Sequence, residues 1–337
     1  MINAARPDIS VVICSHNPRK DFLRRTLDAL KSQSLEIKRW ELLLVDNASI
    51  APLSHEWDLS WHPFGRHIVE PKLGLTNARI CGINAACAPL LVFLDDDNVA
   101  NPDYLALAAD ICLRQPLVGV FGAGKIEPDF EQAPAPELTP YLRFLALRTL
   151  EDSVIKQDPS RGPVPWGAGL CVRTEVANEY ARIVPHCPIR AALGRKGANL
   201  SSGEDDEFSW IARDLGFSHG MFTELQILHL IDQGRVQAPY LEKIIQGNGY
   251  SCAMLASLHG LAGQNPFAVP SLENGLRLMG QIRIRKALSE FINWIRYYRF
   301  HSSLDRRLTQ ARATGWRQGL DDYAKASATP RTQLTDP

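Results

Sequence analysis

The sequence of 337 residues lacks several features that mark other classes of protein. Its 37 Lys and Arg residues balance 37 Asp and Glu residues, so no overall positive charge draws the chain to nucleic acid. No stretch approaches the roughly 18 consecutive apolar residues that a membrane-spanning helix needs. Residues 1–10 are polar and the apolar run behind them is short, so we expect no signal peptide. The composition favours a globular protein that binds no nucleic acid.

Cysteine is present but never in the C-x-x-C spacing of redox or metal sites. None of the seven cysteines has such a neighbour. Cys14 and Cys171 lie inside apolar stretches, as reduced core cysteines do. We therefore expect the cytoplasm as the compartment.

Glycine is missing where several nucleotide-binding classes need it. The segment from Cys14 to Lys20 contains none, and no predicted strand is followed by G-x-G-x-x-G. A dehydrogenase needs that fingerprint, and a nucleotidylyltransferase needs a glycine-rich phosphate loop after its first strand. That strand ends in Ser-His-Asn, whereas an aspartyl phosphatase carries its nucleophilic aspartate there. All three classes are disfavoured, although a sugar-nucleotide nucleotidylyltransferase stays open as an alternative.

The first half of the chain contains a regular alternation of strand and helix signals. Short apolar runs suited to buried strands are separated by segments in which apolar residues recur at helical spacing. The predicted strands are Ile9–Cys14, Glu41–Val45, Arg66–Val69, Pro89–Leu94 and Val118–Gly122. Such a chain is expected to fold as an α/β protein with a mostly parallel central sheet and helices on both faces.

Length and composition predict one large domain with an appended module. We place the domain at residues 1–235, a helical extension at 236–323 and a disordered tail at 324–337. Within the domain, 125–140 holds four prolines and 190–203 holds three glycines. Both segments are therefore predicted to be mobile loops.

Three carboxylates, Asp95, Asp96 and Asp97, come directly after the apolar run of the fourth predicted strand. Clustered aspartates raise one another's pKa values, and a divalent cation removes that cost. Oxygen ligands favour magnesium, manganese or calcium over zinc. Because ligands of parallel α/β sheets bind at the carboxyl ends of strands, the cluster predicts a metal site that holds a phosphorylated ligand. A solvated acidic turn is the other interpretation.

Two more predicted strands run into polar residues, Ser15 after the first and Asp46 after the second. Parallel strands end on one edge of a sheet, so these residues should lie on the rim that carries the three aspartates. An ordinary strand-ending turn would explain Asp46 alone. The convergence of three strand ends indicates a functional site.

Four motifs in a fixed order resemble those of a known family. They are C-S-H-N at 14–17, V-D-N-A-S at 45–49, G-L-T-N-A-R at 74–79 and L-D-D-D at 94–97. Together they are similar to a family 2 glycosyltransferase of the GT-A fold, and the resemblance covers roughly residues 8–235. The family implies a Rossmann-like, mostly parallel sheet flanked by helices.

The resemblance implies a nucleotide-sugar pocket at the first two strand ends. Ser15 takes the place of a small hydroxyl residue in that pocket, with Asn17 beside it, and Asp46 matches the aspartate that binds the base. Arg79 matches an arginine of the same pocket, although a surface helix arginine is the other interpretation. Trp166 and Gly167 resemble the loop that lines the donor sugar and the acceptor, although a tryptophan there can also be a core residue.

The resemblance also implies a manganese or magnesium ion. Asp95 and Asp97 match the D-x-D pair, with Asp97 as the direct ligand and Asp95 nearer the ribose. Asp96 fills the variable middle position of the donor site. His229 and Arg235 resemble a late H-x5-R element, in which the histidine reaches the metal and the arginine the diphosphate. A histidine satisfied within the core is the alternative for His229.

The second acidic stretch resembles the E-D pair that supplies a catalytic base. Asp205 is the better match for the base, and Glu204 would bind the acceptor or orient the base. Asp206 and Glu207 follow directly, so the register of the base can slip by one residue. Acidic residues are also favoured at a helix N-terminus for electrostatic reasons alone.

The chemistry of these residues agrees with what the family implies. A cation bridging two phosphates stabilises a nucleotide diphosphate as it leaves, and a carboxylate on the opposite side can deprotonate an acceptor hydroxyl. One base and one displacement give inversion at the anomeric carbon. We expect transfer from a UDP, dTDP or GDP sugar to a glycan, lipid-linked or small-molecule acceptor, in bacterial polysaccharide or glycoconjugate synthesis. A non-catalytic sugar-nucleotide or glycan binder on the same fold is the alternative.

The segment 277–317 carries ten basic and two acidic residues, with aromatic residues interleaved between 291 and 298. We favour a solvated helix face that caps the core. The other interpretation is a peripheral contact with anionic lipid at the inner face of the membrane.

Overall fold

The computed structural model describes residues 6–197, 200–261, 266–267, 289, 292–293 and 301–328. The chain divides into two compact units, Met1–Gln237 and Ala238–Pro337. Most of the basic segment 277–317, with its aromatic residues, lies outside the described residues, so its contact with lipid remains a prediction. None of the described helices combines the length and apolar character needed to cross a bilayer.

Four parallel strands form the first half of the sheet in the first unit, and they are β1 (Ile9–Ser15), β2 (Trp40–Asn47), β3 (Gly65–Glu70) and β4 (Leu90–Asp95). Their order is β3-β2-β1-β4, with the three inner strands buried and β3 half exposed at the edge. The register pairs Ser15 with Asp46 and Cys14 with Asp95. The polar ends of three strands therefore share one edge of the sheet.

The second half of the sheet is mixed, and its strands are β5 (Asn98–Ala100), β6 (Val118–Phe130), β7 (Arg148–Thr149), β8 (Val154–Lys156), β9 (Leu170–Arg173) and β10 (Ser218–Ile231). β9 runs antiparallel between β4 and β6. β10 is parallel to β6 and antiparallel to β5. The pairing of β10 with β5 sets His229 opposite Asn98, directly after the three aspartates.

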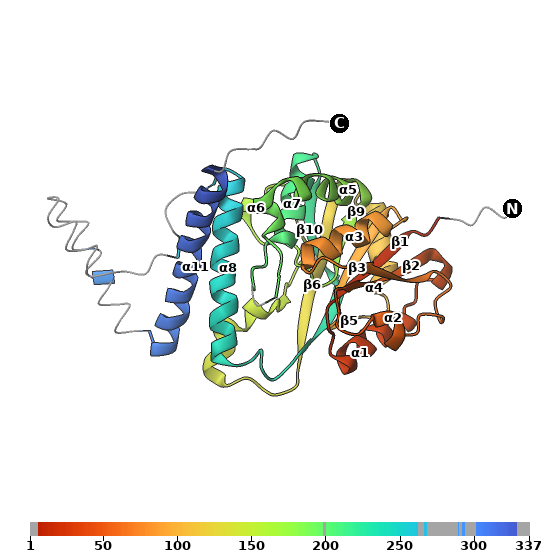
Figure 1. Ribbon diagram of the computed structural model, residues 1–337, viewed down its shortest axis with the longest axis horizontal. Coiled ribbons are helices and arrows are strands. Elements are labelled where there is room, and N and C mark those ends of the chain that lie inside the picture. The colour runs from red at the N-terminus through yellow and green to blue at the C-terminus, as the bar shows by residue number, and fades with distance from the viewer. Residues whose placement is uncertain are drawn as a thin grey trace. The chain divides into compact units, whose positions relative to one another are not determined.

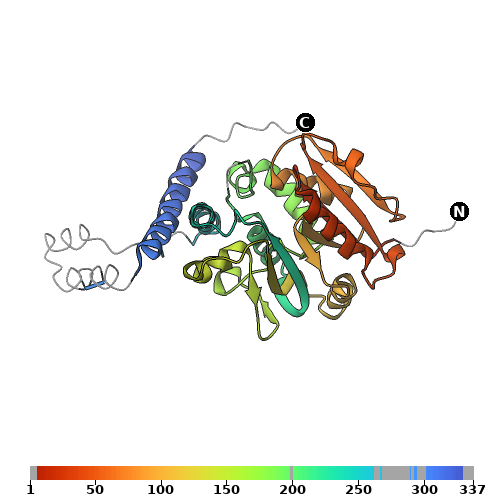
Figure 2. The same cartoon turned by 90° about the horizontal axis from the view of Figure 1, so that it is seen from below.

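Helices cover both faces of this sheet (Figure 1), and the longer ones are α1 (Lys20–Lys31), α3 (Leu75–Ala85), α4 (Tyr104–Arg114), α5 (Thr174–Ile183) and α7 (Glu204–Asp214). Successive side chains of a strand point to opposite faces. Val11 of β1 accordingly joins a core with α1 and α4, and Val12 joins a second core with α3, α5 and α7. Figure 2 shows α1 lying along the parallel strands. This arrangement confirms the predicted α/β class.

Short elements connect these layers. They are the helices α2 (Leu53–Glu56) and α6 (Pro188–Ala191) and the 3-10 segments η1 (Ile37–Arg39), η2 (Pro136–Leu145), η3 (Pro159–Arg161) and η4 (Val184–His186).

The predicted mobile loop at 125–140 is in large part regular structure. β6 continues through it to Phe130 in register with β10, and η2 follows. The prediction was wrong because the prolines were taken as evidence against a strand. Among the described residues, β6 beyond Ile126 pairs with β10 on one side only. Pro128 therefore occupies an edge-like position, where a proline is tolerated.

The second unit contains two long helices, α8 (Ala238–Leu258) and α11 (Ser303–Ala328), packed closely on each other. A Cβ at Gly315 would lie 1.9 Å from the Gln246 carbonyl oxygen, and one at Gly249 would lie 2.1 Å from that of Arg312. Glycine is therefore what allows the two backbones to touch. α11 runs five residues into the predicted disordered tail, because the alanines at its end are strong helix formers. Residues 329–337 lie outside the described residues.

Candidate active site

Asp46 ends β2 with its carboxylate turned into the loop that follows. Its Oδ1 accepts the backbone N–H of Ser49 at 2.9 Å, and its Oδ2 accepts that of Leu53 at 2.9 Å. Burial alone would raise the pKa of this carboxyl, but the N–H groups outweigh burial and the pKa is lowered. Asp46 is therefore an anion that shapes the loop at the predicted nucleotide pocket.

The neighbouring Asn47 joins β2 to both β3 and α3. Its Nδ2 donates to the carbonyls of Glu70 and Lys72, at 3.1 and 2.9 Å. Its Oδ1 accepts the N–H of Gly74 at 2.8 Å, just before α3 begins. His16 Nδ1 donates to the Asn47 carbonyl at 2.8 Å. One amide thus holds together three segments at the edge of the sheet.

Asn17 contacts the loop that Asp46 shapes. It has a left-handed φ of 49°, a conformation that asparagine tolerates better than most residues. Its Oδ1 accepts the N–H of Ile50 at 2.8 Å, and its own N–H donates to Ser49 Oγ at 3.1 Å. Asn17 and Asp46 therefore both hydrogen-bond to the loop that follows β2.

Asp96 faces the end of β1. Ser15 Oγ donates to Asp96 Oδ2 at 2.5 Å. Burial first, and then the charge of Asp97, raise the pKa of Asp96 to about 7. Two predicted donor-site residues are in direct contact, and part of the acidic cluster holds a proton near neutral pH.

Asp97 lies where β10 meets the cluster. Its carbonyl accepts the N–H of Leu230 at 2.9 Å. Its Oδ2 is 3.3 Å from His229 Nε2 and accepts from Arg235 Nη1 at 2.7 Å. Burial favours the neutral acid, but His229, Arg235 and Arg195 outweigh it and lower the pKa of Asp97. Asp97 is anionic, and the predicted pair of Asp97 and His229 is assembled.

The side chains around Asp97 suit a magnesium or manganese ion as a partial ligand set. Asp97 offers carboxylate oxygens beside an imidazole nitrogen of His229, and such ions complete their shells with water and phosphate oxygens. The described part of the chain gathers no three His, Cys, Asp or Glu side chains into a ready metal cluster. His229 Nδ1 is buried without a partner, whereas a ligating histidine usually has one. Asp97 and His229 therefore fit a magnesium or manganese site with two protein ligands, not one in which the protein supplies every ligand.

Arg79 on α3 lies between the two acidic stretches. It is 2% exposed, which excludes a surface arginine. Its Nη1 is 3.1 Å from Glu204 Oε1, and its Nη2 is 3.9 Å from Asp95 Oδ1. A Cβ at Gly167 would lie 2.5 Å from Arg79 Nη2. One buried cation thus joins the end of β4 to the start of α7, beside the predicted sugar-lining loop.

The first turn of α7 carries a compact set of carboxyls. Burial raises the pKa of Glu204 to about 7, against the opposing charge of Arg79. Asp205 Oδ2 accepts the N–H of Gly167 at 2.8 Å. Burial, followed by the charges of Asp205 and Glu204, raises the pKa of Asp206 well above its usual value. The predicted base is therefore fixed to the loop that was predicted to line the sugar.

Two arginines near these carboxyls were missed by sequence reasoning. Arg148 in β7 stacks on Trp166, with its guanidinium carbon 3.7 Å from the ring centroid. Arg195 precedes α7, and its charge lowers the pKa of Asp97. The Arg195 carbonyl accepts the N–H of Leu75 at 3.0 Å, which fastens its loop to α3. Neither arginine belongs to a motif, so no pattern in the sequence pointed to it.

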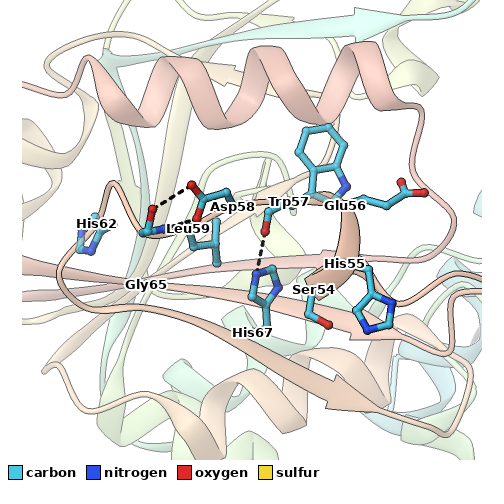
Figure 3. Close-up of a pocket in the computed structure, with 10 residues that line it drawn as sticks. Ser54, His55, Glu56, Trp57, Asp58, Leu59, His62, Gly65 and His67 are labelled. Carbon is cyan, nitrogen blue, oxygen red and sulfur yellow. Dashed lines mark hydrogen bonds between the residues drawn. The ribbon is translucent and has the colours of Figure 1, made fainter.

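A cavity of about 460 Å³ is lined by the segment that connects β2 to β3 and by the first residues of β3, and none of its lining residues is a predicted site residue (Figure 3). Some of its polar groups are paired with one another, whereas Trp57 Nε1, His62 Nε2 and His67 Nδ1 are buried without a hydrogen-bond partner. His67 Nε2 donates to the Trp57 carbonyl at 2.9 Å, and Asp58 accepts from Ser60. The cavity shares no lining residue with the acidic site.

Residues 10–157 match the family model described as glycosyl transferase family 2. That segment contains all four ordered motifs from Ser15 to Asp97. A curated relative, polypeptide N-acetylgalactosaminyltransferase 8 of Drosophila melanogaster, is 35% identical over 104 residues. The match covers 29% of this chain and 18% of the relative, so the chain spans less than a fifth of that relative's length.

Solved structures resemble the chain over most of its length. A mannosyltransferase from Pyrobaculum calidifontis, PcManGT, in complex with GDP-Man and Mn2+, gives a TM-score of 0.51 at 16% identity, covering 96% of this chain and 86% of that one. Residues 1–349 of S. aureus TarS give 0.47 at 16% identity, covering 94% and 91%. The mannosyltransferase shows the fold. Residues 10–157, which include the strand ends that carry the site, match glycosyl transferase family 2, and the chain has the GT-A fold.

Proposed function

We propose that the chain is a metal-dependent, inverting glycosyltransferase that moves a sugar from a nucleotide-diphosphate sugar to an acceptor hydroxyl. The observation that carries the proposal is the position of Arg79, 3.1 Å from Glu204 and 3.9 Å from Asp95. The cluster that would hold the donor and the acidic run that would supply the base therefore lie on two sides of one buried side chain.

The donor would bind at the carboxyl ends of β1, β2 and β4. Asp46 would receive the base, since each carboxylate oxygen accepts one backbone N–H and keeps a lone pair. Ser15, Asn17 and Asp96 would line the same pocket. Asp95 would lie nearer the ribose, and Arg79 would oppose the rise in the pKa of Asp95 that burial and the charge of Asp97 cause.

Asp97 and His229 would hold a Mn2+ or Mg2+ ion. When bound, such an ion supplies Lewis-acid stabilisation of the negative charge that grows on the leaving diphosphate. Arg235 and Arg195 add positive charge on the same side of the site. Fixed cations of this kind stabilise a transition state without having to reorient.

Asp205 would accept the proton of the acceptor hydroxyl. The Gly167 N–H fixes one of its oxygens at 2.8 Å, which limits the orientation of the carboxylate. Glu204 would orient the acceptor or the base while paired with Arg79. Trp166 and Gly167 would line the donor sugar. A single displacement with one base leaves the anomeric configuration inverted.

We propose a UDP, dTDP or GDP sugar as donor. The solved mannosyltransferase of similar fold contains GDP-Man and Mn2+, which supports a nucleotide sugar together with a divalent ion. The acceptor would be a glycan, a lipid-linked sugar or a small molecule, in bacterial polysaccharide or glycoconjugate synthesis. Residues 1–235 would carry the transferase activity and 236–323 a helical extension.

We also propose a cytoplasmic location, at the inner face of the membrane if 277–317 binds anionic lipid. All seven cysteines are free, which supports a reducing compartment.

A panel of nucleotide sugars tests the function. Thermal shift with manganese identifies the donor, because a bound ligand raises the melting temperature, and turnover with a matching acceptor panel follows. Transfer with inversion, lost on chelation of the metal, is the expected result. Tight binding with no transfer to any acceptor would instead favour a non-catalytic sugar-nucleotide binder.

A further inference from the structure

A buried arginine beside the proposed base has an incomplete set of partners. Arg148 is 8% exposed, and its Nη2 donates to the Val164 carbonyl at 2.8 Å. Its Nη1 is buried and has no hydrogen-bond partner. Leaving a buried guanidinium N–H unsatisfied costs free energy, so packing alone does not explain this residue.

Arg148 fixes the segment that holds the base. Its guanidinium carbon lies 3.7 Å from the centre of the Trp166 ring. Gly167 comes next in the chain, and its N–H donates to Asp205 Oδ2 at 2.8 Å. The segment from Val164 to Gly167 is therefore fastened to β7 on one side and to the start of α7 on the other.

The charge of Arg148 acts on the same carboxyls. Arg148 interacts electrostatically with Asp206 and Asp205, and it opposes the rise in the pKa of Asp206 that burial and the neighbouring carboxyls cause. Burial in turn lowers the pKa of Arg148 to about 10. The charged groups that face the two aspartates are Arg148 on β7, Arg79 on α3, and Glu204 and Glu207 on α7, the last paired with Arg190 on α6.

We propose that Arg148 is a positioning residue that fixes the Trp166–Gly167 segment against Asp205. Its role in the reaction rests on the proposed function. Its effect on the carboxyls at the start of α7 can be measured without turnover. No contact of Arg148 with substrate is needed.

The test compares two substitutions. Arg148→Met removes the charge and keeps an unbranched chain that can pack on Trp166, whereas Arg148→Lys keeps the charge. In protein labelled with ¹³C at the aspartate carboxyls, Asp206 should titrate about one pH unit higher in the Met variant, because the charge of Arg148 opposes the rise in its pKa. It should stay close to the wild-type value in the Lys variant. The sign follows because losing a nearby cation disfavours a carboxylate.

Kinetics give a second measurement. The acidic limb of kcat/KM should move toward higher pH in the Met variant, because the substitution removes a cation beside the carboxyls at the start of α7. Arg143→Met is the matched control: Arg143 is exposed, lies over the neighbouring Phe144 and should leave the limb where it is. A merely structural role of Arg148 would lower activity without moving the limb.

Unchanged titrations and an unchanged limb in a folded Met variant would overturn the proposal. Melting temperature and nucleotide binding establish that the variant is folded. If the Met variant does not fold, Arg148→Gln takes its place, and its carboxyl titration and acidic limb should move in the same direction. A wild-type protein that transfers no sugar would refute the proposed function, and the titrations would still decide the role of Arg148.

Discussion

At residue 167 only glycine leaves space for the guanidinium of Arg79, since a Cβ there would lie 2.5 Å from Nη2. Arg79 is in turn the cation that Glu204 and Asp95 share. Removing one partner of such a buried pair costs about 3–5 kcal/mol, because the other charge is left uncompensated. At the scale of single residues, the site therefore depends on an uncharged position as much as on its carboxylates.

Asp205→Asn should lower the rate of transfer by at least about 10²-fold, because a general base contributes on that order. Nucleotide affinity should change little, since Asp205 contacts Gly167 and not the donor cluster. Steady-state turnover and calorimetric binding of the nucleotide, measured on the same preparation, check both halves. Asp206→Asn is the matched comparison. A larger loss of turnover in Asp206→Asn than in Asp205→Asn would assign the base to Asp206. An equal loss of turnover and nucleotide affinity in Asp205→Asn would show that Asp205 has another role.

Asp97→Ala should abolish metal-dependent nucleotide binding. The substitution removes the carboxylate that lies beside His229 and leaves Arg235 without that anion. Titration of the nucleotide with and without manganese measures the effect. Asp129→Ala is the control, because Asp129 is a half-exposed residue of β6 paired with Arg25. Manganese-dependent affinity that survives in Asp97→Ala would remove this residue from the metal site.

The raised pKa of Glu204 predicts a dependence of stability on pH. Burial raises the value from 4.5 to about 7, so the folded state binds a proton more tightly than the unfolded chain. The associated stability is complete below about pH 4.5 and is lost as the pH rises through about 7. Urea unfolding at a series of pH values should show a fall on the order of 1–3 kcal/mol. Glu204→Gln should flatten this slope, and an identical slope would show that Glu204 does not titrate there.

At the scale of elements, the sequence was most informative where strands end. Ser15, Asp46 and the three aspartates were predicted to share an edge because buried strands have a recognisable composition and parallel strands end together. The register confirms that arrangement. Arg148 and Arg195 were missed because they come from short or irregular segments, where tertiary packing and not local pattern decides which way a side chain points.

The close contact of α8 and α11 makes a prediction about a helical glycine. Ala is favoured over Gly in an isolated helix by about 1 kcal/mol. Gly315→Ala should nevertheless destabilise the second unit by about 1–3 kcal/mol, because the new Cβ would lie 1.9 Å from the Gln246 carbonyl oxygen. Hydrogen exchange of 238–258 and 303–328 measures the loss of protection. Gln318→Ala, at an exposed position of α11, is the control, and greater protection in Gly315→Ala would contradict the packing.

At the scale of the whole molecule, the sequence was less informative. The family model ends at residue 157, before β9, α7 and β10. The chain beyond residue 157 contributes Gly167, Asp205 and His229, and each was assigned from a short motif. Beyond residue 237 the chain forms a second unit whose role no motif indicates. Helical periodicity and basic charge predict that helices are present there, but they do not specify what the helices bind.

Asp97 meets His229 and Arg235 across 132 and 138 residues of chain. At roughly 5–20 residues per second, a ribosome makes the three aspartates on the order of ten seconds before it makes β10. Contacts so distant in sequence close late and slow the folding of the domain. During synthesis the nascent chain therefore carries its most recognisable motif well before it has a working site. A fragment that stops short of β10 would keep the motifs that match the family model without the histidine and arginine that contact Asp97.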